Sequence, residues 1–414
     1  MLEYTAAPRG IHSPSGEMKV LKTLAIFPLL LFLLPASVIA RQSTAIVFPL
    51  DRPTKGELPQ WVGEGIALSI SAQLKSRELQ TMDWDERIRI VESLDLPPGA
   101  SLSYGSMIRV AQRAGVDLVI MGAYSGEERN LKISIRVLEV NALKLSGEMV
   151  ANGPLSALPH LENELAWLIL SNNGLDKGSS RQKFQERTRR VPNTGYGYYI
   201  QSLEASGEKD PLQFLLKAVE LYRDFPEAQF RLGQIYFRRG DCGSAMPHLL
   251  LGRNDASSQM ESDFMRGTCY VQGDQLSQAV QALWGLQDSR SYEALNNLGV
   301  AYLRKGDIAL AINALLDARN LSRSDATVLL NLALARHVQG NDSEARNILE
   351  DAIKGNPQNG MLQFLMGAVL KAQGEQDNAT IAFTKAKSLG IKTEKLQMEE
   401  PKTWSRLFSA LVNR

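Results

Sequence analysis

The chain has 414 residues, of which 44% are hydrophobic and 22% are charged, and its formal net charge is +1. A chain of this length is enough for two or three domains, and its apolar content is enough to form their cores. A charge so close to zero gives no reason to expect a nucleic acid or an anionic membrane surface as the partner.

Residues 1–40 are predicted to be an N-terminal extension followed by a signal peptide. Lys19 and Lys22 follow Met18, and an apolar run of 11 residues then extends from Leu24 to Leu34. Val38 and Ala40 occupy the −3 and −1 positions of a cleavage site after Ala40. The alternative is an uncleaved anchor, but a spanning helix needs about 20 apolar residues. Since the chain also has only two cysteines, we expect a periplasmic or secreted protein of the bacterial envelope.

Residues 41–171 are predicted to form a small α/β domain, because short apolar strands alternate there with amphipathic helices. The apolar character of residues 116–125 is nearly continuous, which is typical of a strand buried on both faces. Residues 131–140 alternate between apolar and polar side chains, and we expect this strand to pair with residues 145–153. The remaining segments are strands at 44–50 and 79–84 and helices at 58–77, 85–94, 103–115 and 158–170.

The stretches "IVFPLDRP", "WVGEGIALSISAQL" and "AGVDLVIMGAYSGEERNLKISIRVLEV" are similar to the amino-terminal α/β domain of TolB. This resemblance implies a role in protein interactions in the periplasm rather than catalysis. Residues 172–192 follow as a linker, in which six Lys or Arg residues stand against two acids. Such a composition predicts a solvated tether, with a basic docking segment as the alternative.

Residues 193–390 contain a repeat of about 34 residues, with five clear copies and one degenerate copy before them. Small residues recur at two landmarks in each copy, where two antiparallel helices joined by a turn cross closely. The landmarks are Gly233, Gly267, Gly299, Ala333 and Gly367 on the first helix and Ala245, Ala279, Ala311, Ala345 and Ala379 on the second. A turn signal such as Gly306-Asp307 separates the two landmarks.

This helix–turn–helix pattern resembles the tetratricopeptide repeat. It departs from the family because the usual Trp near the start of the first helix is missing and because Arg336 stands where Tyr is expected. The resemblance implies an all-α solenoid with a concave binding face. TolB-like modules of bacterial envelope proteins are often fused to such repeats. We expect residues 391–414 to form the capping helix, with Trp404, Leu407, Phe408 and Leu411 on one face.

In the tetratricopeptide family the first helix of each repeat lines the concave groove, and this places seven residues of the chain there. Asn297 and Asn331 are one repeat apart, so both project in the same direction, and their amides have donors and acceptors for an extended peptide backbone. The arginines are predicted to pair with ligand carboxylates. The alternatives are that the asparagines satisfy neighbouring helices, that the arginines are solvated and that the phenylalanine is core. The remaining groove residues are Phe230, Arg231, Arg238, Asn296 and Arg304.

Cys242 and Cys269 lie on neighbouring predicted helices, and the sequence leaves one disulfide and two buried free thiols as alternatives. No catalytic motif, metal site or cofactor site is predicted, since His160, His248 and His337 are scattered over separate elements. We therefore expect an exported, non-enzymatic adaptor that binds a peptide or protein in the groove. Its α/β domain is expected to dock another envelope component. The alternative is small-ligand sensing by the α/β domain, with the repeats serving oligomerisation or signal transmission.

Overall fold

The computed structural model describes residues 43–53, 58–75, 79–97, 99, 101–175, 180–186, 188–205, 210–253 and 256–404. All of these residues belong to one compact unit. The predicted signal peptide lies outside them, so its cleavage and the export of the chain stay predictions. Within the described ranges, every helix is too short or too polar to serve as a membrane span.

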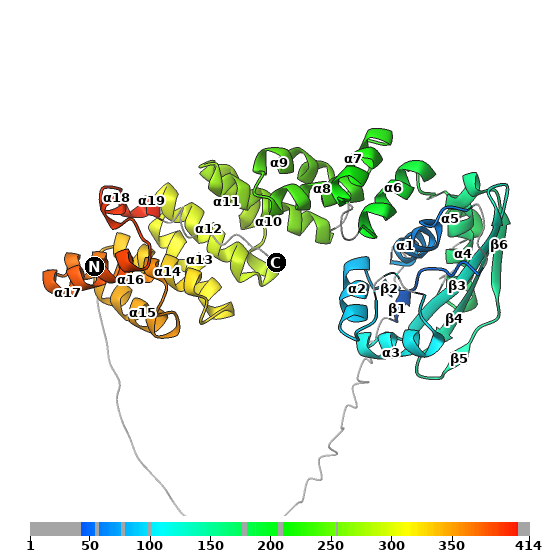
Figure 1. Ribbon diagram of the computed structural model, residues 1–414, viewed down its shortest axis with the longest axis horizontal. Helices are drawn as coiled ribbons and strands as arrows, with labels where there is room; N and C mark the ends of the chain where they lie inside the picture. Colours follow the sequence, from blue (N-terminus) through cyan, green and yellow to red (C-terminus); the bar gives the residue numbers. More distant parts are fainter. Residues whose placement is uncertain are drawn as a thin grey trace, which may run out of the picture. The chain divides into compact units, whose positions relative to one another are not determined.

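A mixed sheet of six strands forms the core of the amino-terminal part (Figure 1), in the order β2-β1-β3-β4-β5, with β6 also paired to β4. β1 is parallel to both β2 and β3, whereas β4 is antiparallel to β3, β5 and β6. The predicted pairing of residues 131–140 with the strand that follows is therefore confirmed. The strands are β1 (Thr44–Val47), β2 (Gln80–Thr81), β3 (Leu118–Glu127), β4 (Asn130–Glu139), β5 (Lys144–Leu145) and β6 (Met149–Gly153).

Helices cover both faces of this sheet, which makes it the middle of three layers. Val47 and Ile120 pack in the same apolar cluster as α1 and α4, and Phe48 and Val119 pack with α2 and α3. All four residues from Leu118 to Met121 are buried, so the two-sided burial expected from the apolar run is confirmed. The four helices are α1 (Val62–Lys75), α2 (Trp84–Glu92), α3 (Tyr104–Ala114) and α4 (Leu158–Asn172).

The described part of the predicted linker packs against α4 and includes a short helix, α5 (Arg181–Gln185). Phe184 is buried, and its carbonyl oxygen accepts a hydrogen bond of 3.4 Å from the side-chain amide of Asn163. Arg181 forms an ion pair of 2.6 Å with Glu164 on α4. The expectation of a solvated tether is therefore wrong for these residues, because their positive charges pair with acids on α4 and one aromatic ring reaches the core.

The rest of the chain is a run of antiparallel helical hairpins, as the repeat predicted. The degenerate copy is α6/α7, and the five clear copies follow from α8/α9 to α16/α17. The hairpins are α6 (Asn193–Leu203), α7 (Pro211–Leu221), α8 (Pro226–Arg238), α9 (Cys242–Leu251), α10 (Ala256–Gln272), α11 (Leu276–Trp284), α12 (Tyr292–Lys305), α13 (Ile308–Leu321), α14 (Ala326–Val338), α15 (Asp342–Gly355), α16 (Gly360–Ala372) and α17 (Gln376–Ser388).

Small residues allow the two helices of each hairpin to approach closely. A Cβ atom added to Gly299 would lie 2.5 Å from Cγ of Leu315, and one added to Gly267 would lie 2.4 Å from Cγ of Leu283. The residue against each glycine is thus one turn beyond the alanine landmark of the second helix. Gly306 ends α12 with a φ of +95°, a conformation that favours glycine.

The first hairpin packs directly on the α/β layers, so the two predicted domains share one apolar core. A Cβ atom on Gly197 of α6 would lie 2.6 Å from Nε1 of Trp61, and the hydroxyl of Tyr196 donates a hydrogen bond of 3.0 Å to the carbonyl oxygen of Gly65. Close approach of α6 to α1 therefore depends on glycine in the contact.

The C-terminal segment differs from the single capping helix that was expected over residues 391–414. It forms two short helices, α18 (Thr393–Gln397) and α19 (Pro401–Trp404), and residues 405–414 lie outside the described part. α19 contacts α12 and α14, the first helices of two repeats, and its Trp404 also meets Phe364 of α16. The expected apolar face of Leu407, Phe408 and Leu411 falls among the residues that are not described.

Candidate protein-interaction surface

The three predicted groove asparagines are buried, and their side chains form a row of hydrogen bonds. The amide of Asn331 on α14 donates to Oδ1 of Asn296 on α12 at 2.8 Å, and the amide of Asn296 donates to Oδ1 of Asn297 at 3.2 Å. The amide of Asn297 donates in turn to the hydroxyl of Thr268 on α10 at 2.9 Å. All three asparagines are fully buried. The three asparagines are therefore not open to solvent, and the row ties three consecutive repeats together; that they contact a peptide stays a prediction.

The two helices that carry these asparagines are buried on every side. Ten consecutive residues of α12, 294–303, and eight of α14, 328–335, are buried. A helix turns once every 3.6 residues, so ten consecutive residues point in all directions around the axis. In contrast, α8 leaves Phe230 and Gln234 half-buried and Arg238 exposed. The concave side of α12 and α14 is therefore covered.

Trp404 of α19 supplies part of this cover. Its ring stacks on His337 of α14, with centroids 6.4 Å apart and planes 13° apart, and meets Phe364 of α16 edge-on at 4.9 Å. The indole N–H donates to the carbonyl oxygen of Leu396 at 2.9 Å, so its polar group is satisfied within the same segment. Only 5% of Trp404 is exposed. His337 and Phe364 thus form an aromatic slot that the side chain of Trp404 occupies.

Two of the predicted groove arginines make contacts within the protein. Arg231 on α8 pairs with Asp85, and its guanidinium lies 5.6 Å from the ring centroid of Trp84. Both partners belong to α2, so Arg231 fastens the solenoid to the α/β layers. Arg304 on α12 donates to the carbonyl oxygen of Val271 at 2.5 Å and pairs with Asp274 at 2.6 Å. Neither arginine points freely into a groove, because acids of neighbouring elements hold both.

Arg238 is the predicted groove arginine that remains exposed, with only a hydrogen bond of 3.4 Å from Nε to the carbonyl oxygen of Gln234. Phe230 serves the packing of its hairpin, since a Cβ atom on Gly252 would lie 2.5 Å from its Cα. Phe230 is nevertheless only half-buried. Among the predicted groove residues, the accessible ones are therefore on α8, namely Arg238 and one side of Phe230.

Cys242 and Cys269 are joined by a disulfide bond, so of the two alternatives left by the sequence the structure has the bridged form. The bond links the first residue of α9 to the last turn of α10 and closes a separation of 27 residues. It thus connects two successive repeats near the accessible part of the face.

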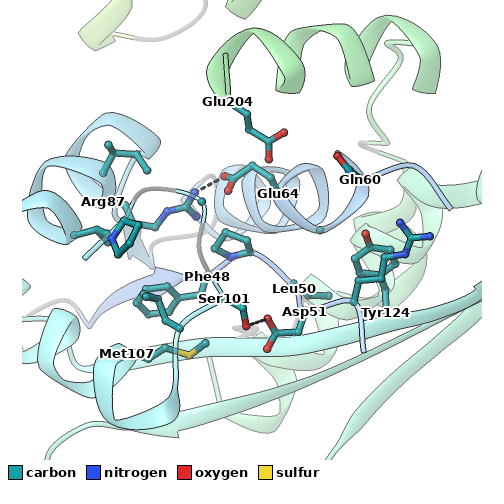
Figure 2. A pocket seen from close by; sticks show the side chains of 18 residues that line it. Phe48, Leu50, Asp51, Gln60, Glu64, Arg87, Ser101, Met107, Tyr124 and Glu204 are labelled. Carbon is teal, nitrogen blue, oxygen red and sulfur yellow. Dashed lines mark hydrogen bonds and ion pairs between the residues drawn. The ribbon is translucent and has the colours of Figure 1, made fainter. Parts of the chain in front are cut away.

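A second candidate site is a cavity of about 370 Å³ in the α/β layers (Figure 2). It lies at the carboxyl end of β1, next to Phe48 and Asp51. The neighbours of β1 are β2 on one side and β3 on the other, and all three strands are parallel. Ligands of open α/β sheets bind where the strand order changes direction in this way. The sequence reasoning missed this cavity, although the strand followed by "FPLD" and the helix opening "WVGEG" signalled its walls.

Charged side chains line the cavity on several sides. Arg87 of α2 pairs with Glu64 in the first turn of α1, and both are nearly fully buried. Arg87 also donates to the carbonyl oxygen of Val47 at 2.7 Å, so it joins α1, α2 and the end of β1. Glu204, which follows α6, points toward Glu64 from the solenoid side (Figure 2). Burial raises the pKa of Tyr124 in the opposite wall, against the opposing charge of Arg52.

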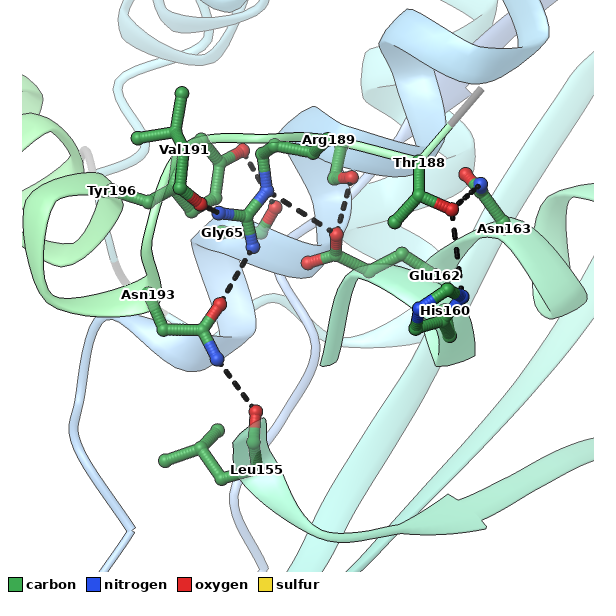
Figure 3. Close-up of polar contacts among 11 residues, drawn as sticks. Gly65, Leu155, His160, Glu162, Asn163, Thr188, Arg189, Val191, Asn193 and Tyr196 are labelled. Atoms are coloured by element: carbon green, nitrogen blue, oxygen red, sulfur yellow. Dashed lines mark hydrogen bonds and ion pairs between the residues drawn. The ribbon is translucent and has the colours of Figure 1, made fainter. Parts of the chain in front are cut away.

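A buried polar cluster lies where the linker meets the α/β layers (Figure 3). Glu162 of α4 is fully buried, accepts a hydrogen bond of 2.6 Å from the hydroxyl of Ser69 and lies 3.6 Å from Nε of Arg189. The Arg189 guanidinium lies 3.8 Å from the ring centroid of Tyr196 and donates to Oδ1 of Asn193 at 3.0 Å. Burial raises the pKa of Glu162 to about 7, although Arg189 and Ser69 act to lower it.

The cluster is a structural joint, because it ties α4 to the start of the solenoid. No metal centre is indicated among the residues that the structure describes, since no three His, Cys, Asp or Glu side chains gather there.

The hairpins with their small crossing residues define a helical repeat protein. Residues 264–326 and 297–360 match the sequence profile of the tetratricopeptide repeat, so this part of the run of hairpins consists of tetratricopeptide repeats.

Solved structures of two tetratricopeptide-repeat proteins are similar to part of the chain. MamA is 23% identical, with a TM-score of 0.35, over 41% of this chain and 98% of its own. YrrB, described as a TPR protein with an unusual peptide-binding site, is 14% identical, with a TM-score of 0.37, over 45% of this chain and 98% of its own. No curated protein matches the sequence.

Proposed function

We propose that the protein is an exported, non-enzymatic adaptor whose tetratricopeptide solenoid binds a peptide or protein partner on its concave face. The observation that supports this most strongly is the aromatic slot beside His337 and Phe364, which holds the side chain of Trp404. A face that holds one peptide segment has the shape and polar groups to hold another. The peptide-binding site named for YrrB is consistent with this function.

The envelope location in this proposal is based on the signal peptide and on the resemblance of the α/β domain to that of TolB. In this proposal the α/β domain docks a second envelope component. The disulfide between Cys242 and Cys269 is consistent with an oxidising compartment.

Photo-crosslinking in living cells of the native host tests the location of the partner surface. p-Benzoylphenylalanine in place of Arg238 probes the concave face, and the same residue in place of Ile381, which is 68% exposed on α17, is the matched control. We expect a protein adduct from position 238 and none from position 381. Equal adducts from both positions, or none from position 238, would reject the concave face as the binding surface.

The cavity at the end of β1 favours one other function, the sensing of a small polar ligand by the α/β domain. Gln60 is exposed and lines this cavity, so Gln60→Trp fills space there and leaves the residues of the Glu64–Arg87 pair unchanged. A thermal-shift screen of amino acids, sugars and nucleotides on both proteins tests this function. A compound that stabilises the original chain but not the variant supports it, and a screen without any such compound counts against it.

A further inference from the structure

We propose that the C-terminal segment of the chain, residues 391–414, is an intramolecular ligand of the concave face. We further infer that a partner peptide binds by displacing this segment. The second statement is based on the proposed adaptor function, whereas the first does not need any partner.

The described part of the segment already runs backward over the repeats. After α17 the chain turns at Gly390, which has a φ of +87°. Ile391 then packs on α16, since a Cβ atom on Gly360 would lie 2.6 Å from its Cγ1. Trp404 follows between Phe364 of α16 and His337 of α14. The segment therefore leaves the end of the stack and crosses the first helices of earlier repeats in reverse order.

Trp404 has the properties of an anchor. It is the one aromatic residue of the described segment, it is buried, and two rings of different repeats enclose it. Its indole N–H is satisfied by Leu396, so burial leaves no polar group unpaired. Met398 in the same segment is 88% exposed, whereas Thr393, Leu396 and Trp404 are buried, so contact with the solenoid is made at separate points along the segment.

We assign the remaining cover of α12 to the ten residues that follow Trp404. α19 touches α12, and α12 is buried on all sides, including Asn296 and Asn297. Neighbouring helices are about 8–10 Å apart. Ten residues span about 15 Å as a helix and about 33 Å when extended, which is enough to cross α12.

The segment is tethered on the face, and this favours it over a second copy of the chain. A short tether gives an effective concentration on the order of millimolar. Its sequence, "SRLFSALVNR", has apolar side chains for the groove and no acid. A partner must compete with this occupant, so its apparent affinity falls in proportion to the open fraction of the protein. We expect the partner to be a peptide with an aromatic residue for the Trp404 slot.

Competition in trans tests the occupant. A fluorescent peptide with the sequence of residues 401–414 is titrated with three full-length proteins: the original chain, Trp404→Ala and Met398→Ala as the matched control. Trp404→Ala opens the face, so we expect it to bind the peptide at least about tenfold more tightly than the original chain. Met398→Ala should bind like the original chain. Equal affinity of all three proteins, or no binding to Trp404→Ala, would overturn the proposal.

A crosslink within the otherwise unchanged chain tests the same contact without opening the face. p-Benzoylphenylalanine replaces Phe408, and the monomeric product is digested with trypsin. We expect a crosslink to the peptide of residues 291–304, which carries Asn296 and Asn297. Crosslinks confined to the second helices of the repeats, or absent, would refute the proposal. If this crosslink forms while position 238 captures no partner, the intramolecular contact stands and the adaptor function fails.

Discussion

Replacing the buried carboxyl group in the joint should change how stability depends on pH. Glu162 is fully buried, and burial raises its pKa to about 7 from an ordinary value of 4.5. A carboxyl group with a raised pKa in the folded state stabilises the fold below pH 4.5, and this contribution is lost as the pH rises through 7. The difference between about 7 and 4.5 corresponds to about 3 kcal/mol, at about 1.4 kcal/mol for each pH unit.

Glu162→Gln removes this contribution and keeps an oxygen that accepts from Ser69. We therefore expect the free energy of unfolding of the variant, relative to the original chain, to rise by about 3 kcal/mol between pH 4.5 and pH 8. Urea unfolding of both proteins at a series of pH values measures this difference, because all other groups titrate alike in the two chains and cancel.

The matched control is Glu164→Gln, which also replaces a glutamate of α4 with glutamine, two residues further along the helix. The partner of Glu164 is Arg181, whose side chain is 62% exposed, and such ion pairs contribute at most about 1 kcal/mol. We therefore expect this control to change the stability at pH 8 by no more than that amount. A difference between Glu162→Gln and the original chain that stays constant with pH, or that falls, would refute the reasoning about the joint.

Two further substitutions test the solenoid. Gly299→Ala should lower the free energy of unfolding by about 1–3 kcal/mol, because the new Cβ atom meets Leu315; Gly355→Ala, which meets no atom within 4 Å, should cause no loss in thermal unfolding. Cys242→Ser should cost about 3 kcal/mol, as expected for opening the 27-residue separation to Cys269. In chemical unfolding, a reductant should lower the free energy of unfolding of the original chain to that of the serine variant. A free energy that does not change with the reductant would contradict the estimate.

Local patterns were enough to predict the elements of both parts of the chain. The hairpins follow from glycines such as Gly299, because only a small residue permits the close crossing and this requirement recurs in every copy. The strands follow from runs such as residues 118–121, whose burial on both faces needs continuous apolar character. In each case the signal and the contact lie within about one repeat or one strand.

The state of the concave face could not be predicted in the same way, because the cover of α12 involves a segment that is distant in the sequence. Asn297 and Trp404 are more than 100 residues apart, and the sequence around Asn297 does not indicate that the segment of Trp404 packs on α12. One local signal was nevertheless present. The run "ALNNLGVAYL" is apolar on all sides of a helix apart from its asparagines, and this is typical of a helix that is buried all round.

The linker was misjudged for a related reason. Its basic composition predicts solvation only if no acid faces it, but Glu162 and Glu164 of α4 meet Arg189 and Arg181. Charge counts along the sequence contain no information about which acid lies opposite. The same holds for Arg231, whose partner Asp85 is 146 residues earlier in the chain.

These long-range contacts mean that the two candidate functions are physically connected. The cavity at β1 is lined by Glu204, which directly follows the first helix of the solenoid, as well as by Glu64 and Arg87 of the α/β layers. On the same side, Arg231 holds α8 to Asp85 of α2. A small molecule in the cavity would therefore contact both parts, and its binding energy would depend on how α2 and α6 meet. If such a molecule exists, Gln60→Trp should alter partner binding as well as ligand binding, whereas an adaptor with an inert cavity would bind its partner unchanged.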